Sequence, residues 1–342
     1  MTRSLRSLLA LVVLATAAAP APARAQRLDS LVLRFAAMTA VTGYEDAVAD
    51  TVRALVPALR ADRAGNLVWT RGRGSPIRTA ICPLDEVGWV VGGITAGGYL
   101  TLRRVGATPM GPFFDQFLEG QRVTVFGRRG PVPGAVAVRS THLQRGRASG
   151  TDEPFSLDNA SVDVGASSPA GVAALGIELL APLARTKVPH RYGVGLVAAP
   201  FAVQRGACAA LAAAVRTLAA GPGGFTSTGE AAGTAVAVFA RRRHFGNDGA
   251  AFALMELQRA QPEDAESFSV VLLGGAAPPD SLGAGAAPLT RDSVAVPGRV
   301  RAASAWSLPA RYARSPVETI ALRDVETLYQ RLVAFLGVAV PR

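Results

Sequence analysis

Few residues in this chain have the types and spacing that enzymes use for chemistry. Only three histidines occur, His142, His190 and His244, and no two of them lie at the spacing of a metal-ligand pair. The sequence contains no G-x-S-x-G elbow, phosphate-binding P-loop, H-E-x-x-H pair or C-x-x-C motif. Each histidine is therefore interpreted as a surface or capping residue rather than a metal ligand.

Two cysteines and an arginine-rich composition narrow the remaining possibilities. Cys82 and Cys208 allow either a disulfide or two buried thiols, and both alternatives stay open. The formal net charge of +11 comes almost entirely from arginine, because Lys187 is the single lysine. Basic runs such as 241–243 are not interleaved with aromatic residues, as single-strand nucleic-acid binders require. We therefore expect no nucleic-acid partner.

The N-terminus has the layout of a secretory signal peptide. Arg3 and Arg6 precede an apolar stretch over 8–19, and Ala-Arg-Ala follows at 23–25. We predict a signal peptide over 1–25, cleaved after its last residue. The apolar stretch is too short to span a bilayer, and no later stretch reaches the required length. A periplasmic or secreted protein without a membrane span is expected.

The apolar pattern predicts the elements that must position any site. Helices are expected at 28–38, 45–59, 169–184, 205–219, 248–259 and 321–337. Strands are expected at 66–70, 77–82, 192–197, 234–240, 267–273 and 301–307. This alternation predicts an α/β/α sandwich formed by 26–86 and 165–342. Short strands punctuated by glycine and proline predict a small β-rich domain inserted at 87–164.

A series of short motifs resembles one enzyme family along nearly the whole chain. They are Thr42-Gly43-Tyr44-Glu45, Asp62 with Gly65-Asn66-Leu67, Asp85-Glu86-Val87-Gly88, Thr141-His142-Leu143, Asp163-Val164-Gly165-Ala166, Gly249-Ala250, Arg311-Tyr312 and Ser315-Pro316-Val317-Glu318. Their order resembles that of the glutamyl and tetrahedral, twelve-subunit aminopeptidases of metallopeptidase family forty-two, some of which are labelled endoglucanases. The resemblance implies a zinc-aminopeptidase fold, a β-rich dimerisation insert and two zinc or cobalt ions.

The positions that carry metal ligands in this family hold other residues here. Pro83 stands in place of the first histidine ligand, and Val203 in place of the bridging aspartate. Arg243 stands at the general base, His244 at the neighbouring glutamate ligand, and Arg314 at the last histidine. The resemblance therefore implies loss of the metal centre and of the general base, so no cofactor and no catalytic residue are predicted.

Two further departures concern the strand and loop that complete the family's active site. The stretch 268–277 contains no carboxylate where a liganding aspartate is expected. The chain is also shortened near 293–302, where the family has a helix, a strand and an active-site loop. An incomplete substrate pocket is expected.

Some of these positions could still form a different site. Asp85 and Glu86 are interpreted as relics that hold a loop. The alternative is that His244, together with Asp85 or Asp248, forms a new site for one metal ion. Arginines at 205, 243 and 314 could converge to bind a carboxylate or phosphate. The alternative is that Arg205, Arg243 and Arg314 face solvent or pair with nearby acidic residues.

These observations predict an exported pseudo-peptidase with a binding or scaffold role. It is expected to form a homodimer or higher homo-oligomer through the insert, with a peptide as a possible ligand. The alternative is an active metallo-aminopeptidase, or another hydrolase, whose metal ligands have moved elsewhere.

Overall fold

The computed structural model describes most of the chain but not all of it. The described residues are 21–106, 110, 113–138, 155–220, 232–245, 248–259, 268–274 and 302–337. The predicted signal peptide up to residue 20, the motif around His142 and the shortened segment as far as residue 301 lie outside them.

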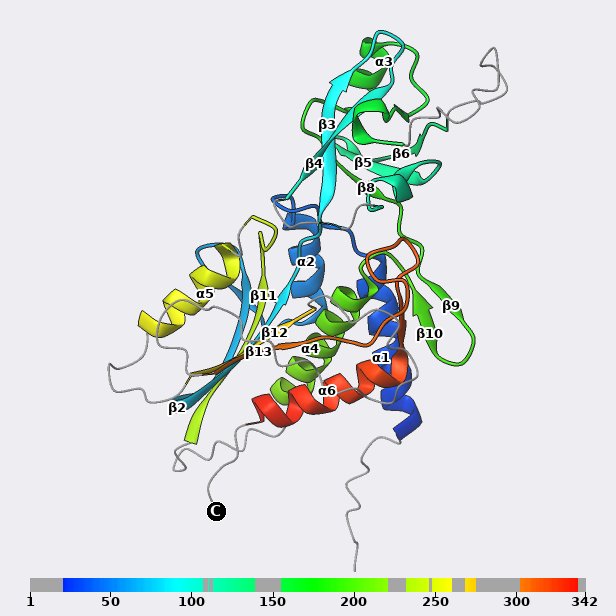
Figure 1. The fold of residues 1–342 in the computed structure, drawn as a ribbon. Coiled ribbons are helices and arrows are strands. Elements are labelled where there is room, and N and C mark those ends of the chain that lie inside the picture. Colours follow the sequence, from blue (N-terminus) through cyan, green and yellow to red (C-terminus); the bar gives the residue numbers. More distant parts are fainter. Residues whose placement is uncertain are drawn as a thin grey trace, which may run out of the picture.

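The larger body is built on a mixed sheet whose strands meet in an unusual order (Figure 1). The strands are β1 (Arg60–Ala61), β2 (Leu67–Pro83), β11 (Ala232–Ala240), β12 (Phe268–Leu273) and β13 (Ala302–Trp306). Val236 of β11 pairs with both Thr70 and Thr79 of β2. The two strands predicted at 66–70 and 77–82 are thus two arms of β2, and β11 lies between them.

Helices cover both faces of this sheet. Against one face lie α1 (Ala21–Ala37), α2 (Asp46–Leu55), α4 (Ala202–Ala220) and α6 (Leu322–Leu336). On the other face lies α5 (Asp248–Arg259), where Ala253 and Leu254 pack on Val236 and Val238. Helix α4 is buried around most of its circumference, as expected for an alanine-rich helix at the centre of a core. The predicted α/β sandwich is confirmed.

A closed β-barrel is inserted into this sandwich and stands at one end of it (Figure 1). Its strands are β3 (Gly88–Ile94), β4 (Leu100–Val105), β5 (Arg122–Gly127), β6 (Gly130–Val136), β7 (Val162–Asp163) and β8 (Pro182–Arg185). Two short 3-10 helices, η1 (Gln116–Leu118) and η2 (Leu157–Asn159), accompany them. The barrel has its own core, which includes Trp89, Phe114 and Leu183.

The helix predicted at 169–184 begins where expected but is much shorter than predicted. Helix α3 (Pro169–Ala174) is short, and the chain then enters β8, which pairs with β3 and β5 and closes the barrel. All four residues of β8 are buried and the first three are apolar, and a short apolar run cannot be told from a buried helix by its periodicity. The barrel strands therefore extend beyond residue 164, where the insert was predicted to end.

A small antiparallel sheet joins the barrel's exit to the last part of the chain. It consists of β9 (His190–Tyr192), β10 (Leu196–Ala198) and β14 (Thr319–Ala321), with β10 in the middle. The single strand predicted at 192–197 is instead a hairpin, because Gly193 and Gly195 have positive φ angles and reverse the chain. Pairing with β14 brings the loop at 311–318 to the start of α4.

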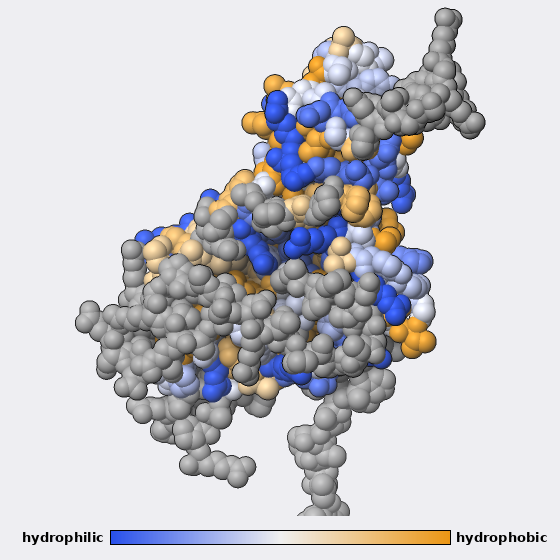
Figure 2. Space-filling model, viewed as in Figure 1, coloured by the Kyte–Doolittle hydropathy of each residue, from blue (hydrophilic) through white to orange (hydrophobic). Residues whose placement is uncertain are grey.

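The hydropathy of the described helices and of the visible surface bears on the expected environment. In the part of the chain that the structure describes, no helix is long and apolar enough to cross a membrane. Figure 2 shows hydrophilic side chains gathered where the barrel meets the α/β body, above the carboxyl ends of the main strands.

Candidate functional site

The predicted site residues meet at the carboxyl ends of the parallel strands. Pro83 ends β2 and pairs with Ala240 at the end of β11, so Arg243 and His244 follow close by. Leu273 ends the neighbouring strand β12, and Val203 lies in the first turn of α4. Open α/β sheets bind ligands at this edge, where loops leave the strands. The sheet therefore brings the positions inferred from the sequence to one region.

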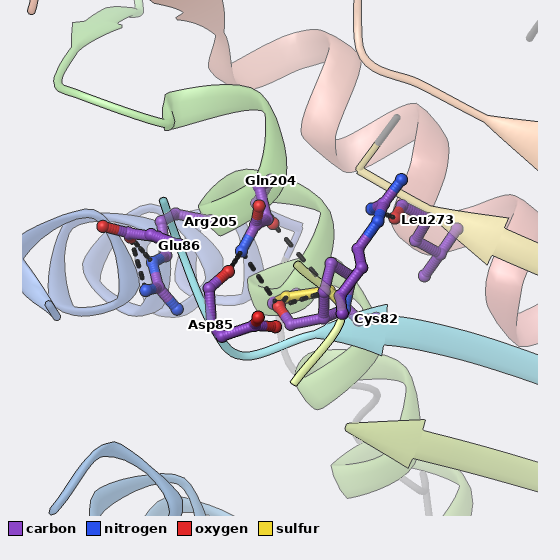
Figure 3. Close-up of a disulfide and its surroundings, with 9 residues drawn as sticks. Cys82, Asp85, Glu86, Gln204, Arg205 and Leu273 are labelled. Atoms are coloured by element: carbon purple, nitrogen blue, oxygen red, sulfur yellow. Dashed lines mark hydrogen bonds and ion pairs between the residues drawn. A yellow bond between two sulfur atoms is a disulfide. The ribbon is translucent and has the colours of Figure 1, made fainter. Parts of the chain in front are cut away.

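The segment that follows β2 is held on α4 by covalent and polar links. Cys82 and Cys208 form a disulfide with a Cα–Cα distance of 5.5 Å, which decides between the two alternatives left open by the sequence. The Gln204 amide donates hydrogen bonds to the carbonyl oxygens of Pro83, at 3.2 Å, and Asp85, at 2.6 Å (Figure 3). Pro83 itself offers no side-chain donor to a metal.

Asp85 binds the loop that follows β11. Its Oδ2 accepts a hydrogen bond of 2.9 Å from the backbone N–H of His244, and both residues are buried. Burial lowers the pKa of His244, the nearby Asp85 carboxylate opposes this shift, and Arg243 adds to it. Burial thus favours the neutral imidazole of His244, which is not the surface or capping residue expected from the sequence. Asp85 binds the backbone of the loop that carries His244.

Arg243, the residue that the family resemblance predicts at the general-base position, lies half-buried in the loop after β11. Its Nη1 is 3.5 Å from the carbonyl oxygen of Leu273, which is a long contact for a hydrogen bond. Burial lowers the pKa of Arg243, and the charge of Asp85 opposes this effect. A guanidinium is still protonated in proteins, so this side chain can donate but cannot accept a proton.

Glu318 binds the backbone at Val203 and Arg314, the two remaining positions predicted from the sequence. Its Oε1 accepts from the backbone N–H of Val203 at 2.8 Å, and its Oε2 accepts from that of Arg314 at 2.7 Å. Burial raises the pKa of the Glu318 carboxyl, and the two backbone donors counteract this. Arg314 and Tyr312 have φ angles of 63° and 54°, a conformation that costs about 1–2 kcal/mol in a residue with a side chain. The buried carboxylate stabilises this strained loop against the helix.

A buried ion cluster lies beside this region. Glu86 Oε1 accepts from Arg205 Nε at 2.5 Å and also forms an ion pair with Lys187. Lys187 Nζ donates to the Met38 carbonyl oxygen at 3.0 Å. Burial lowers the pKa of Lys187 to about 8, an effect that Glu86 opposes and Arg205 strengthens. Sequence reasoning missed Lys187 as part of the site, and its only signal was that it is the sole lysine.

A second missed residue is Glu45, which holds the arginine run after β11. Its Oε1 accepts from the Arg242 backbone N–H at 3.0 Å, and its Oε2 is 3.2 Å from Arg241 Nη2. Glu45 belongs to the Thr-Gly-Tyr-Glu motif and is fully buried. Glu45 of this motif thus positions the loop that carries Arg243.

The three arginines proposed as an anion site are not equivalent. Arg205 is completely buried and bound to Glu86, so its guanidinium is not presented to a ligand. Arg243 is half-buried and Arg314 is exposed. Any anion-binding role therefore stays a prediction for the latter two. His190 lies outside the site, on β9, where its ring stacks on Tyr192 at 5.7 Å.

The side chains at this edge do not fit a dinuclear metal centre. Zinc sites need three or four nitrogen, sulfur or oxygen donors, and catalytic sites keep a further open position. Within the described ranges, no group of three or more His, Cys, Asp or Glu residues could hold a metal ion. Both cysteine sulfurs are joined to each other, and Arg243 adds positive charge.

Part of the chain is similar in sequence to known aminopeptidases. The model of the M42 glutamyl aminopeptidase family matches residues 65–232, a stretch that includes Pro83 and Val203 but ends before Arg243. SgcX of Escherichia coli (strain K12) is 32% identical over 179 residues, which are 50% of this chain and 46% of SgcX. The lysyl aminopeptidase of Pyrococcus furiosus is 29% identical over 133 residues, 37% of each chain. The chain thus spans less than half the length of these curated relatives.

Solved structures share the fold over almost their entire length. The aminopeptidase APDkam598 from the archaeon Desulfurococcus kamchatkensis has a TM-score of 0.70 at 20% identity, covering 93% of this chain and 96% of that one. The TET1 peptidase of Pyrococcus horikoshii, which can assemble into a tetrahedron or a large octahedral shell, has a TM-score of 0.69 at 19% identity, covering 90% and 99%.

The sandwich and the inserted barrel define the fold that this chain shares with these solved aminopeptidases. Over residues 65–232, just under half of its length, the chain is similar to the M42 glutamyl aminopeptidase family.

Proposed function

We propose that this chain is an exported, non-catalytic member of the M42 family, with its metal ligands and general base replaced, which serves in binding or as a scaffold. The observation that carries the proposal is the set of contacts at the aligned positions. Pro83 is bound by Gln204, Val203 and Arg314 are bound by Glu318, and His244 is bound by Asp85. All four contacts are made through backbone groups, so they fix the loops at these positions, while the side chains of Pro83, Val203 and Arg314 are not types that bind a metal ion.

Charge gives a second argument against a divalent ion at this edge. Two unit charges 4 Å apart interact by about 4 kcal/mol at an effective dielectric near 20, and a divalent ion doubles this. Arg243 would therefore repel a neighbouring metal by several kcal/mol. A protonated guanidinium also cannot take the proton from a water nucleophile, so a hydrolytic step lacks its base.

The decisive test is metal binding and peptidase activity in the purified chain. After dialysis against zinc or cobalt, we expect less than stoichiometric metal by elemental analysis. We also expect no metal-dependent release of leucine, lysine or glutamate from aminoacyl anilides, because no ligand set or base is available. Two metal ions per chain together with metal-dependent turnover would establish the alternative, an active hydrolase with relocated ligands.

A matched variant separates true activity from a contaminating peptidase. Any weak turnover should be compared with that of Asp85→Asn, prepared in the same way. Turnover that belongs to this site should change in that variant, because Asp85 positions His244. Identical turnover in both preparations points to contamination and leaves the proposal standing.

Export and self-association are supported by separate observations. The buried disulfide suits an oxidising compartment, as the predicted signal peptide requires. On the barrel, Phe113 and Phe117 are 60% and 40% exposed, which suits an interface between copies of the chain. A mature N-terminus at Gln26 and a light-scattering mass of at least a dimer are expected. A monomer with residues 1–25 retained would contradict both parts.

A further inference from the structure

The contacts at this edge join the segments that a metal centre joins in an active family member. A dinuclear site links the end of one strand, the start of a helix and the loops after neighbouring strands. In this chain the same segments are linked by protein groups alone. The residues after β2 are tied to α4, and the loop at 311–318 is tied to α4 by Glu318. The absence of a fitting metal site therefore does not leave this edge open.

The strongest of these links lies between β2 and α4. Three successive contacts join residues 82–86 to the first turns of the helix, as Figure 3 shows. The disulfide fixes Cys82 to Cys208, and the Gln204 amide binds two backbone carbonyl oxygens of the segment. Arg205 then binds Glu86. The cysteines, Arg205 and Glu86 are almost completely buried, so water competes little with these bonds.

The Gln204 contacts show what the disulfide contributes to the link between residues 82–86 and α4. The amide donates to the Pro83 and Asp85 carbonyl oxygens, which requires α4 to stay within hydrogen-bond reach of the segment. A covalent bond next to Pro83 and one helical turn beyond Gln204 maintains this reach. The disulfide and Gln204 thus act on the same few residues from two sides.

We infer that the Cys82–Cys208 disulfide, together with Gln204, replaces the metal centre as the cross-link between β2 and α4. The order of the candidate site then depends on the oxidation state of these two cysteines and not on a divalent metal. This inference rests on the proposed loss of the metal centre. It goes further by making the site redox-dependent.

Reduction tests the inference directly. A phosphine reductant breaks the S–S bond, two electrons and two protons yield two thiols, and the phosphine becomes its oxide with oxygen from water. We expect the backbone amides of Leu84 and Glu86, which donate to Ala240 and Ala40, to exchange with solvent faster in the reduced chain. The barrel amide of Val91, bonded to Ala181, is the internal reference. The acceleration at Leu84 and Glu86 should exceed that at Val91 at least about ten-fold.

A ratio between amides is used because loss of a disulfide also lowers global stability, which accelerates all three amides alike. Equal acceleration at Leu84, Glu86 and Val91 would show that the bond secures the whole fold, and would overturn the inference. Unchanged exchange after complete reduction, verified by mass, would overturn it as well.

Two further experiments test the inference without a reductant. Gln204→Leu, with the disulfide intact, should accelerate exchange at Leu84 and Glu86 relative to Val91, whereas Gln330→Leu on the exposed face of α6 should not. Addition of a chelator to the oxidised chain should change nothing. A chelator effect at these amides would reveal a bound metal and overturn the proposed function too. Absence of both a chelator and a reductant effect would overturn only this inference.

Discussion

Replacing Glu86 with glutamine is expected to lower the free energy of unfolding by about 3–5 kcal/mol. Glu86 is the carboxylate bound to both Arg205 and Lys187, and all three side chains are almost completely buried. Glutamine has nearly the same shape but no charge, so two buried cations would lose their common counter-ion. Chemical denaturation followed by tryptophan fluorescence at pH 7 measures the change.

Two comparisons show whether the loss comes from the buried charges. Asp50→Asn removes the partner of Arg53 in an exposed pair, and it should cost at most about 1 kcal/mol. Adding Lys187→Met to Glu86→Gln should restore part of the lost stability, because one uncompensated cation is removed. A loss below about 1 kcal/mol for Glu86→Gln alone would show that the cluster does not depend on this carboxylate.

Lys187 is expected to make the protein more stable as the pH rises above 8. Burial lowers its pKa from the ordinary value of 10.5 to about 8 in the folded chain. Between these two values the unfolded chain binds more protons than the folded chain, so stability rises with pH across this window. One pKa unit corresponds to about 1.4 kcal/mol, which gives a total rise of about 3 kcal/mol. Below pH 8 the cost of burying the charge is fully present.

The measurement compares unfolding free energies from pH 7 to pH 10.5 in the wild type and in Lys187→Met. The other groups that titrate in this range, including the tyrosines and Arg185, are common to both proteins, so the difference between the two curves reports Lys187. The variant should lack the rise, whereas Arg53→Met, which removes an exposed cation, should keep it. Parallel curves for the wild type and Lys187→Met would contradict the lowered pKa.

The sequence was most informative where a pattern repeats over many residues. The helix predicted at 248–259 matches α5 in both bounds, and those at 205–219 and 321–337 match α4 and α6 to within a few residues. The helix predicted at 169–184 was too long, because its last part is β8, a short buried strand in which apolar periodicity carries no information. The path of β11 between the arms of β2 could not be predicted, since local pattern does not specify pairing partners.

The candidate site was predictable in outline but not in its connections. Family motifs identified Asp85 and Glu86 as residues that hold local structure. The partners depend on the packing of α4, which brings Arg205 to Glu86 and Gln204 to the Pro83 carbonyl oxygen. Lys187 carries no motif at all, and only its burial against Glu86 shows its part in the cluster.

The position of β11 also bears on how the chain folds during synthesis. The two arms of β2 are made early, but the strand that belongs between them emerges only after the whole barrel and α4. Until then the arms have unpaired edges, and contacts between residues so distant in sequence form slowly. The barrel, by contrast, can close from its own strands. Its completion would shorten the effective distance that β11 must search, so the inserted domain would guide the assembly of the sheet that carries it.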